Sequence, residues 1–213
     1  MLLAVASAAA CGLTPLPPPD EFGRRVDAGA ASLGAGLSCH ARDAYDLSGD
    51  AAYVWGSNFH LPSASACCEA CAAHRATCGL GADPKATFWD DGARQLRCGR
   101  ARGKCNAWVY CAAAGGQCFS YDVHVHRRGE CWLKHEPNTS APIAAGPTLP
   151  KAMREAPRHQ WPWAVSEKVW PAAQPPERID WQSGIVAEAG ADVWRFVRKP
   201  GWHRRFCNRH GPC

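Results

Sequence analysis

Thirteen cysteines in a chain of 213 residues are the feature that most limits how this sequence can fold. Such a density is typical of secreted domains, in which disulfides form in an oxidising compartment and stabilise a small apolar core. A reducing cytosol would keep so many thiols free unless a metal or a redox reaction used them. The sequence therefore predicts a disulfide-bonded extracellular protein.

The N-terminus agrees with an extracellular destination. Residues 2–10 are apolar and mostly small, and Ala8-Ala9-Ala10 form a small-residue cleavage site before Cys11. We expect residues 1–11 to be a signal peptide whose removal leaves twelve cysteines, enough for six bridges; cleavage before Cys11 would leave thirteen, one of them unpaired. No later stretch approaches the roughly 20 apolar residues of a membrane span.

Composition divides the rest of the chain into four parts. They are a Pro/Gly/Ala-rich leader (12–38), a cysteine-rich folded unit (39–135), a Pro-rich linker (136–178) and a Trp/Arg-rich tail (179–213). Prolines remove backbone donors and fix local geometry, so the linker is expected to hold no continuous helix or central strand. The tail contains Cys207 and Cys213, which are close enough to pair, and it either packs onto the folded unit or stays independent.

One helix is predicted in the folded unit. Ser63 or Ser65 caps a helix over about 66–74, because alanines favour helix and a serine oxygen accepts an otherwise unpaired backbone amide. On that helix Cys67 and Cys71 are four residues apart and share a face.

Strands are expected on the C-terminal side of this helix. Strand periodicity over 105–111 places Trp108 and Tyr110 on the side that faces away from the helix. Two more strands, 121–126 and 130–133, are expected to form a hairpin through Arg127-Arg128-Gly129.

Three segments carry a resemblance to a known family. They are Cys67-Cys68-Glu69-Ala70-Cys71, Cys105-Asn106-Ala107-Trp108-Val109-Tyr110-Cys111 and Gly129-Glu130-Cys131-Trp132-Leu133-Lys134. In this order they resemble the PAN/Apple domain family over about residues 39–134, especially the versions found in secreted and cell-surface proteins of algae and protists. The resemblance implies an α+β fold, a small disulfide-rich module in which one helix packs on a curved, five-stranded antiparallel sheet between irregular flanking segments. It also implies a non-enzymatic role in binding carbohydrate or protein.

The resemblance further implies disulfide pairs. By the family pattern, Cys71 joins Cys105 at the start of the central strand, and Cys67 joins Cys131 in the final strand. Cys68 and Cys111 are then candidates for an additional bridge. This chain departs from the pattern in an insertion over 78–104, within which we pair Cys78 with Cys98. Cys39 and Cys118 are left to join each other or the tail.

Other chemistries have less support in the sequence. The cysteines lack the two short paired spacings of a zinc site, and Cys68-Glu69-Ala70-Cys71 lies inside a helix and not at the helix start that a redox pair needs. His124 and His126 share a face of an expected strand, where they line a polar surface or hold a metal; surface histidines are the expected case. Asp90-Asp91 are expected to begin a turn. No local motif for serine or cysteine hydrolysis is present.

Candidate ligand contacts are aromatic or basic. Trp108 and Tyr110 either stack on a sugar ring or pack in the core, and Trp132, beside a bridging cysteine, is expected in the core. A basic stretch either meets sulfated or uronic polysaccharide or is a solvated loop: Arg94, Arg97, Arg100, Arg102 and Lys104. It has no interleaved aromatic residues, so nucleic acid is not expected as a partner. Asn138-Thr139-Ser140 is an N-glycosylation sequon.

These observations predict a secreted or cell-surface binding module without enzymatic activity, metal or cofactor. Its expected partner is an extracellular carbohydrate or protein, in adhesion or in the extracellular matrix. The alternatives are a purely structural, disulfide-stabilised extracellular component and an accessory fragment of a larger secreted enzyme.

Overall fold

The computed structural model describes residues 13–15, 33, 36–48, 51–79, 81–99, 103–161 and 165–210. The expected signal peptide and most of the expected leader lie outside the described residues. Among the described residues, none of the helices combines the length and apolar character that crossing a membrane requires.

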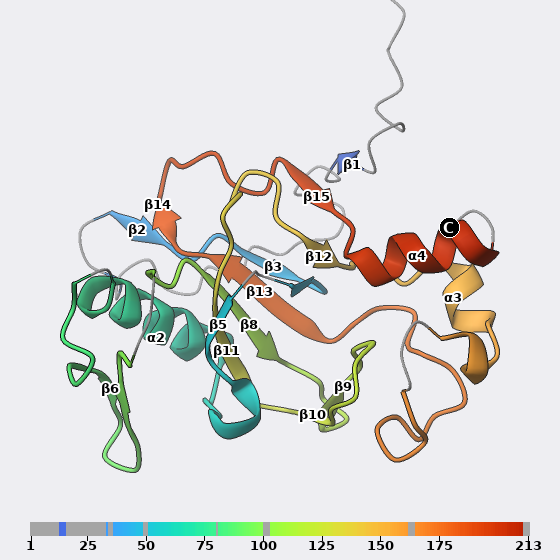
Figure 1. Ribbon diagram of the computed structural model, residues 1–213, viewed down its shortest axis with the longest axis horizontal. Helices are drawn as coiled ribbons and strands as arrows, with labels where there is room; N and C mark the ends of the chain where they lie inside the picture. The colour runs from blue at the N-terminus through green and yellow to red at the C-terminus, as the bar shows by residue number, and fades with distance from the viewer. Residues whose placement is uncertain are drawn as a thin grey trace, which may run out of the picture.

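The described chain forms an α+β fold with antiparallel sheets and one long helix (Figure 1). The helices are α2 (Ala64–Thr77), α3 (Lys151–Glu155) and α4 (Gly201–His210), with 3-10 turns at η2 (Gly56–Asn58) and η3 (Arg158–Gln160). The strands of the largest sheet, in spatial order, are β3 (Ala41–Asp43), β13 (Trp181–Ile185), β8 (Ala107–Cys111), β11 (Cys131–His135) and β5 (Ala51–Val54).

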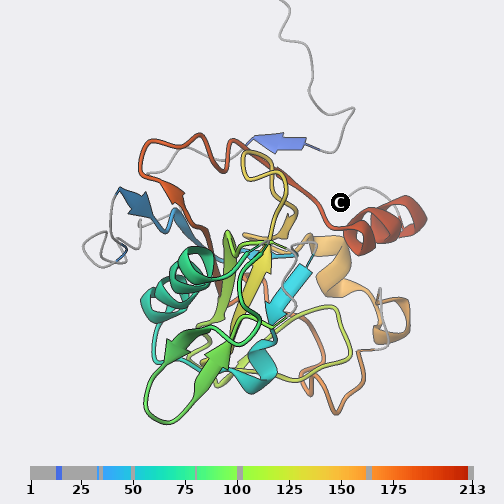
Figure 2. The same ribbon diagram turned by 60° about the vertical axis from the view of Figure 1, so that its left-hand side comes forward.

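The remaining strands form two-stranded pairs around this sheet. They are β1 (Leu13–Pro15) with β15 (Phe196–Arg198), β2 (Leu37–Ser38) with β14 (Ala187–Glu188), β4 (Asp46–Leu47) with β12 (Ala144–Ala145), β6 (Thr87–Asp90) with β7 (Gln95–Arg97), and β9 (Gln117–Cys118) with β10 (His126–Arg127). Figures 1 and 2 place α2 on one side of the central sheet, and α3 and α4 together at the opposite end of the molecule.

Helix α2 begins earlier and ends later than the sequence predicts. Its N-cap is Ser63, whose hydroxyl oxygen accepts from the Ala66 amide at 3.1 Å. Ser65 is inside the helix and donates to Glu69 at 3.2 Å. The alanine-rich sequence that follows sustains the helix to Thr77, where Cys78 becomes its C-cap.

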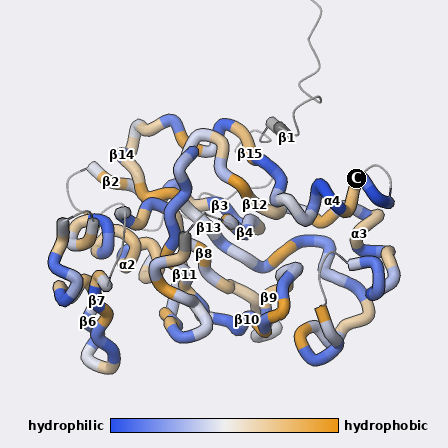
Figure 3. Tube along the Cα trace, viewed as in Figure 1, coloured by the Kyte–Doolittle hydropathy of each residue, from blue (hydrophilic) through white to orange (hydrophobic). Residues whose placement is uncertain are grey.

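Two apolar cores lie on the two faces of the central sheet. The helix-side core packs α2 against Trp108, Tyr110 and Leu133, and the far-side core contains Val109, Trp132 and many residues of the C-terminal half. Figure 3 shows hydrophobic and hydrophilic segments interspersed along the described chain, as expected when a core is assembled from many short strands.

The sequence prediction is wrong about the side of the sheet on which Trp108 and Tyr110 lie. Both side chains face the helix, whereas the prediction has them facing away from it. The prediction counted the alternation of side chains from Cys105, but β8 begins only at Ala107, so Cys105 lies before the pleated strand and does not obey its period.

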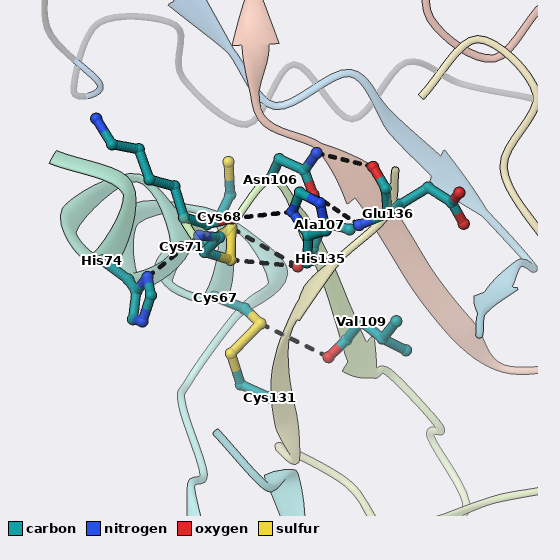
Figure 4. The surroundings of a disulfide bond; sticks show 12 residues. Cys67, Cys68, Cys71, His74, Asn106, Ala107, Val109, Cys131, His135 and Glu136 are labelled. Carbon is teal, nitrogen blue, oxygen red and sulfur yellow. Dashed lines mark hydrogen bonds between the residues drawn. A yellow bond between two sulfur atoms is a disulfide. The ribbon is translucent and has the colours of Figure 1, made fainter. Parts of the chain in front are cut away.

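Five disulfides are described, and three are the pairs expected from the resemblance and the insertion. Those three are Cys67–Cys131, Cys71–Cys105 and Cys78–Cys98. Figure 4 shows the first of them joining α2 to the sheet beside Val109.

The predicted pair of Cys68 with Cys111 is wrong. Cys68 bonds Cys39, and Cys111 bonds Cys118 across a separation of 7 residues. Cys111 lies on the far side of the sheet, so it does not face α2. Cys207 is disulfide-bonded, whereas Cys213 lies outside the described residues, so their pairing stays a prediction.

The expected strand at 121–126 is also wrong. These residues form bends, and only His126 and Arg127 make a short strand, β10, which pairs with β9 and not with 130–133. Asp122 accepts from the His124 amide at 2.8 Å, which favours a local turn over an extended strand.

The folded unit does not end at residue 135 but continues into the expected linker and tail. β13, from the expected tail, lies between β3 and β8 in the central sheet. The expected linker also joins the far-side core, through Leu149, Met153 and Trp161. Of the alternatives left open by the sequence, the tail packs onto the folded unit.

The insertion over 78–104 forms the β6–β7 hairpin, which projects from the body (Figure 2). The Asp91 carboxylate accepts from the Ala93 and Arg94 amides, so Asp90-Asp91 begin a turn as the sequence predicts. The Cys78–Cys98 bond closes the base of this insertion.

Gly184 is the point where β13 passes the Trp108 indole. A Cβ at this position would lie 2.5 Å from the Trp108 ring and would also overlap the Cys39 carbonyl. We expect Gly184→Ala to lower the free energy of unfolding by about 1 to 3 kcal/mol, the usual cost of overpacking a core. Denaturant unfolding without reductant measures it. Gly190→Ala, which adds a Cβ with nothing within 4 Å, is the control; equal stability of the two variants would contradict this packing.

Candidate functional site

The aromatic residues that the sequence offers as a sugar platform are not at the surface. Trp108 is fully buried and Tyr110 is 6% exposed, both in the helix-side core. Gly184 and α2 cover this side of the strand, so neither ring is open to a ligand. Of the two alternatives left open by the sequence, core packing is the correct one.

The basic candidates do not form one described surface. Arg97 is exposed on β7, in the hairpin. Lys104 lines a groove beside α2 with Glu69 and Arg75, and Arg97 does not line it. Arg100 and Arg102 lie outside the described residues.

His126 is a buried residue and not the expected surface histidine. Its Nε2 lies 2.8 Å from an Asp122 oxygen, and its Nδ1 lies 2.9 Å from a Glu130 oxygen. His124 remains exposed, and the two imidazoles do not share a strand face. The turn at 122–125 brings Asp122 back toward the ring, which an extended strand would not allow.

Two carboxylates hold His126 in its charged form. Burial alone would lower the pKa of His126, but the hydrogen bonds and charges of Asp122 and Glu130 outweigh it and raise the pKa to about 9. Conversely, burial would raise the pKa of each carboxyl, and the hydrogen bond from His126 holds both below their usual range. At neutral pH the three groups form an imidazolium between two carboxylates.

Glu130 also holds two other neighbours of this cluster in place. It is buried, and it also accepts from the Trp132 indole at 3.1 Å and from the Arg127 amide at 2.8 Å. The His126 ring lies between two indoles, with centroids 5.2 Å from Trp181 and 5.7 Å from Trp132. The cluster therefore fixes the orientation of two tryptophans as well as a charge.

His126, Trp132 and Trp181 border a cavity of about 330 Å³ on the far side of the sheet, which we call the central cleft. Its lining combines aromatic, charged and hydroxyl side chains around Val109. The other lining residues are Asp46, Ser48, Ser120, Tyr121, Asp122, His126, Trp132, Lys134, Trp181 and Trp202.

Asp46 and Lys134 are two further charged residues that line the central cleft. Burial raises the pKa of Asp46, while Lys134 partly offsets the shift; burial also lowers the pKa of Lys134. The Lys134 ammonium donates to the Leu47 carbonyl and lies 5.8 Å from the Trp132 ring centroid.

The central cleft is assembled from distant parts of the chain. Asp46 comes from β4, Trp132 and Lys134 from β11, Trp181 from β13 and Trp202 from α4. Sequence reasoning did not single out Asp46, Lys134, Trp181 or Trp202 as ligand contacts, and it favoured core packing for Trp132. One local signal was present: Asp122 and Glu130 stand four residues before and four after His126.

Comparison with protein families, with curated proteins and with solved structures finds no match for this chain. The geometry of the cleft is therefore the basis for a functional proposal.

The His126 cluster makes stability depend on pH. Because the folded pKa of about 9 lies above the usual 6.5, protonation stabilises the fold fully below pH 6.5, and this contribution is lost as pH rises through 9. We expect the free energy of unfolding to fall by about 3 kcal/mol over this range. Denaturant unfolding with the disulfides intact measures the loss.

His126→Gln should abolish most of this pH dependence, because glutamine does not titrate. Burial lowers the pKa of the other two buried histidines, His74 and His203, to about 4, so they stay neutral above pH 6.5 and do not contribute. A wild-type stability that is flat from pH 6.5 to 9, or a variant that keeps the same slope, would contradict the arrangement.

Proposed function

We propose that this protein is an extracellular recognition module that binds a neutral carbohydrate in the central cleft. The observation that carries the proposal is the half-buried Trp202 indole beside carboxylate, ammonium and hydroxyl groups in one cavity, whose lining also includes the more deeply buried Trp132 and Trp181. A pyranose presents an apolar face of C–H groups and an edge of hydroxyls. Indole rings complement the first, and hydrogen-bonding side chains complement the second.

The charges of the central cleft favour a neutral sugar over an acidic one. Three carboxyl groups, those of Asp46, Asp122 and Glu130, lie close to two cations, the Lys134 ammonium and the His126 imidazolium. A uronic or sulfated sugar would bring its anion into a site in which carboxyl groups outnumber cations. Hydroxyl groups donate to the carboxylates and accept from the ammonium without such a conflict.

The proposal assigns recognition and not catalysis to this site. Both ring nitrogens of His126 are occupied by carboxylate partners, so neither is open to accept a proton from a bound substrate. The cluster is better suited to hold Trp132 and Trp181 in place for a ligand.

An extracellular location is part of the same proposal. Five disulfides support it, because such bonds form in oxidising compartments. Asn138 is exposed, and its side-chain oxygen accepts from Ser140 Oγ at 3.1 Å, so the sequon is accessible for glycosylation. Membership of the PAN/Apple family is likewise a proposal, supported by one helix stapled by Cys67–Cys131 and Cys71–Cys105 to a five-stranded antiparallel sheet.

Binding to a glycan array of neutral, uronic and amino sugars tests the proposal. We expect saturable binding to neutral sugars, and a loss of about tenfold or more in affinity on Trp202→Ala, since a stacked ring contributes about 1.4 kcal/mol. Trp202 is half-buried on α4 and packs on Tyr121 with ring centroids 4.5 Å apart.

Trp170→Ala is the matched control. Trp170 is also half-buried and packs on an aromatic ring, Phe119, but it does not line the central cleft. A wild-type protein that binds none of the sugars would contradict the proposal and favour a purely structural role. If Trp202→Ala and Trp170→Ala lowered the affinity for the sugar equally, the binding site would lie elsewhere than in the central cleft.

A further inference from the structure

Trp55 is an exposed aromatic residue that lies next to the central cleft but does not line it. Its exposed fraction is 55%, the highest of any tryptophan among the described residues. Its ring centroid lies 5.3 Å from that of Trp132, at an interplanar angle of 55°.

Contact with Trp132 places Trp55 on the same side of the sheet as the cleft. Trp132 belongs to the far-side core and lines the cleft, and its ring packs on that of Trp55. Trp55 directly follows β5, whose last residue, Val54, pairs with Leu133 of β11. Trp55 therefore lies beside Trp132, just outside the cleft.

Trp132 is held firmly between the two sites. Its indole N–H donates to buried Glu130 at 3.1 Å, and the backbone of Gly56 packs so close that a Cβ there would overlap the indole. Trp132 is only 9% exposed, so most of its ring is fixed by neighbours. A ligand that enters the cleft meets the same rigid indole that supports Trp55.

The position of Trp55 at the sheet edge leaves room for a ligand to extend. β5 is the last strand of the central sheet and has no neighbour beyond it in the described chain. The Trp55 ring centroid lies 5.3 Å from that of Trp132, which lines the cleft, and this distance is close to the length of one pyranose unit. A chain of sugars that crosses the strands from the cleft thus reaches Trp55 with its next unit.

We propose that Trp55 is a second sugar subsite, so that the ligand is a linear oligosaccharide of neutral hexoses and not a single sugar. This inference rests on the proposed function of the central cleft and adds the length of its ligand. The indole of Trp55 stacks on the unit outside the cleft, and the cleft holds the unit inside.

Calorimetry with neutral gluco-, manno- and galacto-oligosaccharides of one to four units tests the subsite. In the wild-type protein, affinity should rise about five- to tenfold from the monosaccharide to the disaccharide in the series that binds, as expected for one added aromatic contact. Trp55→Ala should lose this gain and keep the monosaccharide affinity within about twofold. Trp55→Phe, which retains an aromatic face, should keep most of the gain.

The controls separate this inference from the function on which it rests. Val123→Ala removes another side chain that is 55% exposed, and it should leave the length dependence unchanged. Affinity independent of length, or a length dependence that survives Trp55→Ala, would overturn the second subsite while the cleft itself remains a sugar site. Failure of every oligosaccharide to bind the wild-type protein would overturn the proposed function as well.

Discussion

The attachment of α2 to the central sheet by three cysteines from two successive turns of the helix is the constraint on which the rest of the structure depends. Cys67 bonds β11, Cys71 bonds the residue that leads into β8, and Cys68 bonds Cys39 at the entry to β3. One helix thereby fixes three strands that are far apart in sequence. Each such bond typically contributes about 2 to 4 kcal/mol, largely by restricting the unfolded chain. The bond at Cys131 also sets the place of its neighbour Trp132, the indole shared by the cleft and Trp55.

The far side of the same sheet is where function is proposed, and it is formed by the C-terminal half of the chain. β13 fills the gap between β3 and β8, and α4 closes one wall of the central cleft with Trp202. Helix α2 and its three disulfides stabilise one face of the sheet. The other face combines charged and aromatic groups in a cavity. Beside that cavity His126 pairs with two carboxylates, which lowers the electrostatic cost of burying them next to indoles.

Local features were predictable from the sequence, and long-range pairings were not. The capped, alanine-rich helix and its bonds at Cys67 and Cys71 follow from short-range spacing together with a family resemblance. The sequence prediction put Trp108 on the wrong face of the sheet, because strand β8 starts at Ala107, two residues after Cys105. His126 was placed on a strand, in which residues four apart are separated by about 13 Å, so its contacts with Asp122 and Glu130 were excluded from the start. Nothing local marks β13 as a central strand, because its pairing with β8 spans the proline-rich segment.

The most direct measurement is the disulfide map of the natively folded protein. Cys67 and Cys68 are adjacent, so no protease separates them, and stepwise partial reduction with alkylation before mass spectrometry is needed to assign their partners. Bonds from Cys67 to Cys131, Cys68 to Cys39 and Cys71 to Cys105 are the predicted result. Free thiols at these positions, or a bond from Cys68 to Cys111, would contradict the attachment of the helix and with it the placement of the cleft.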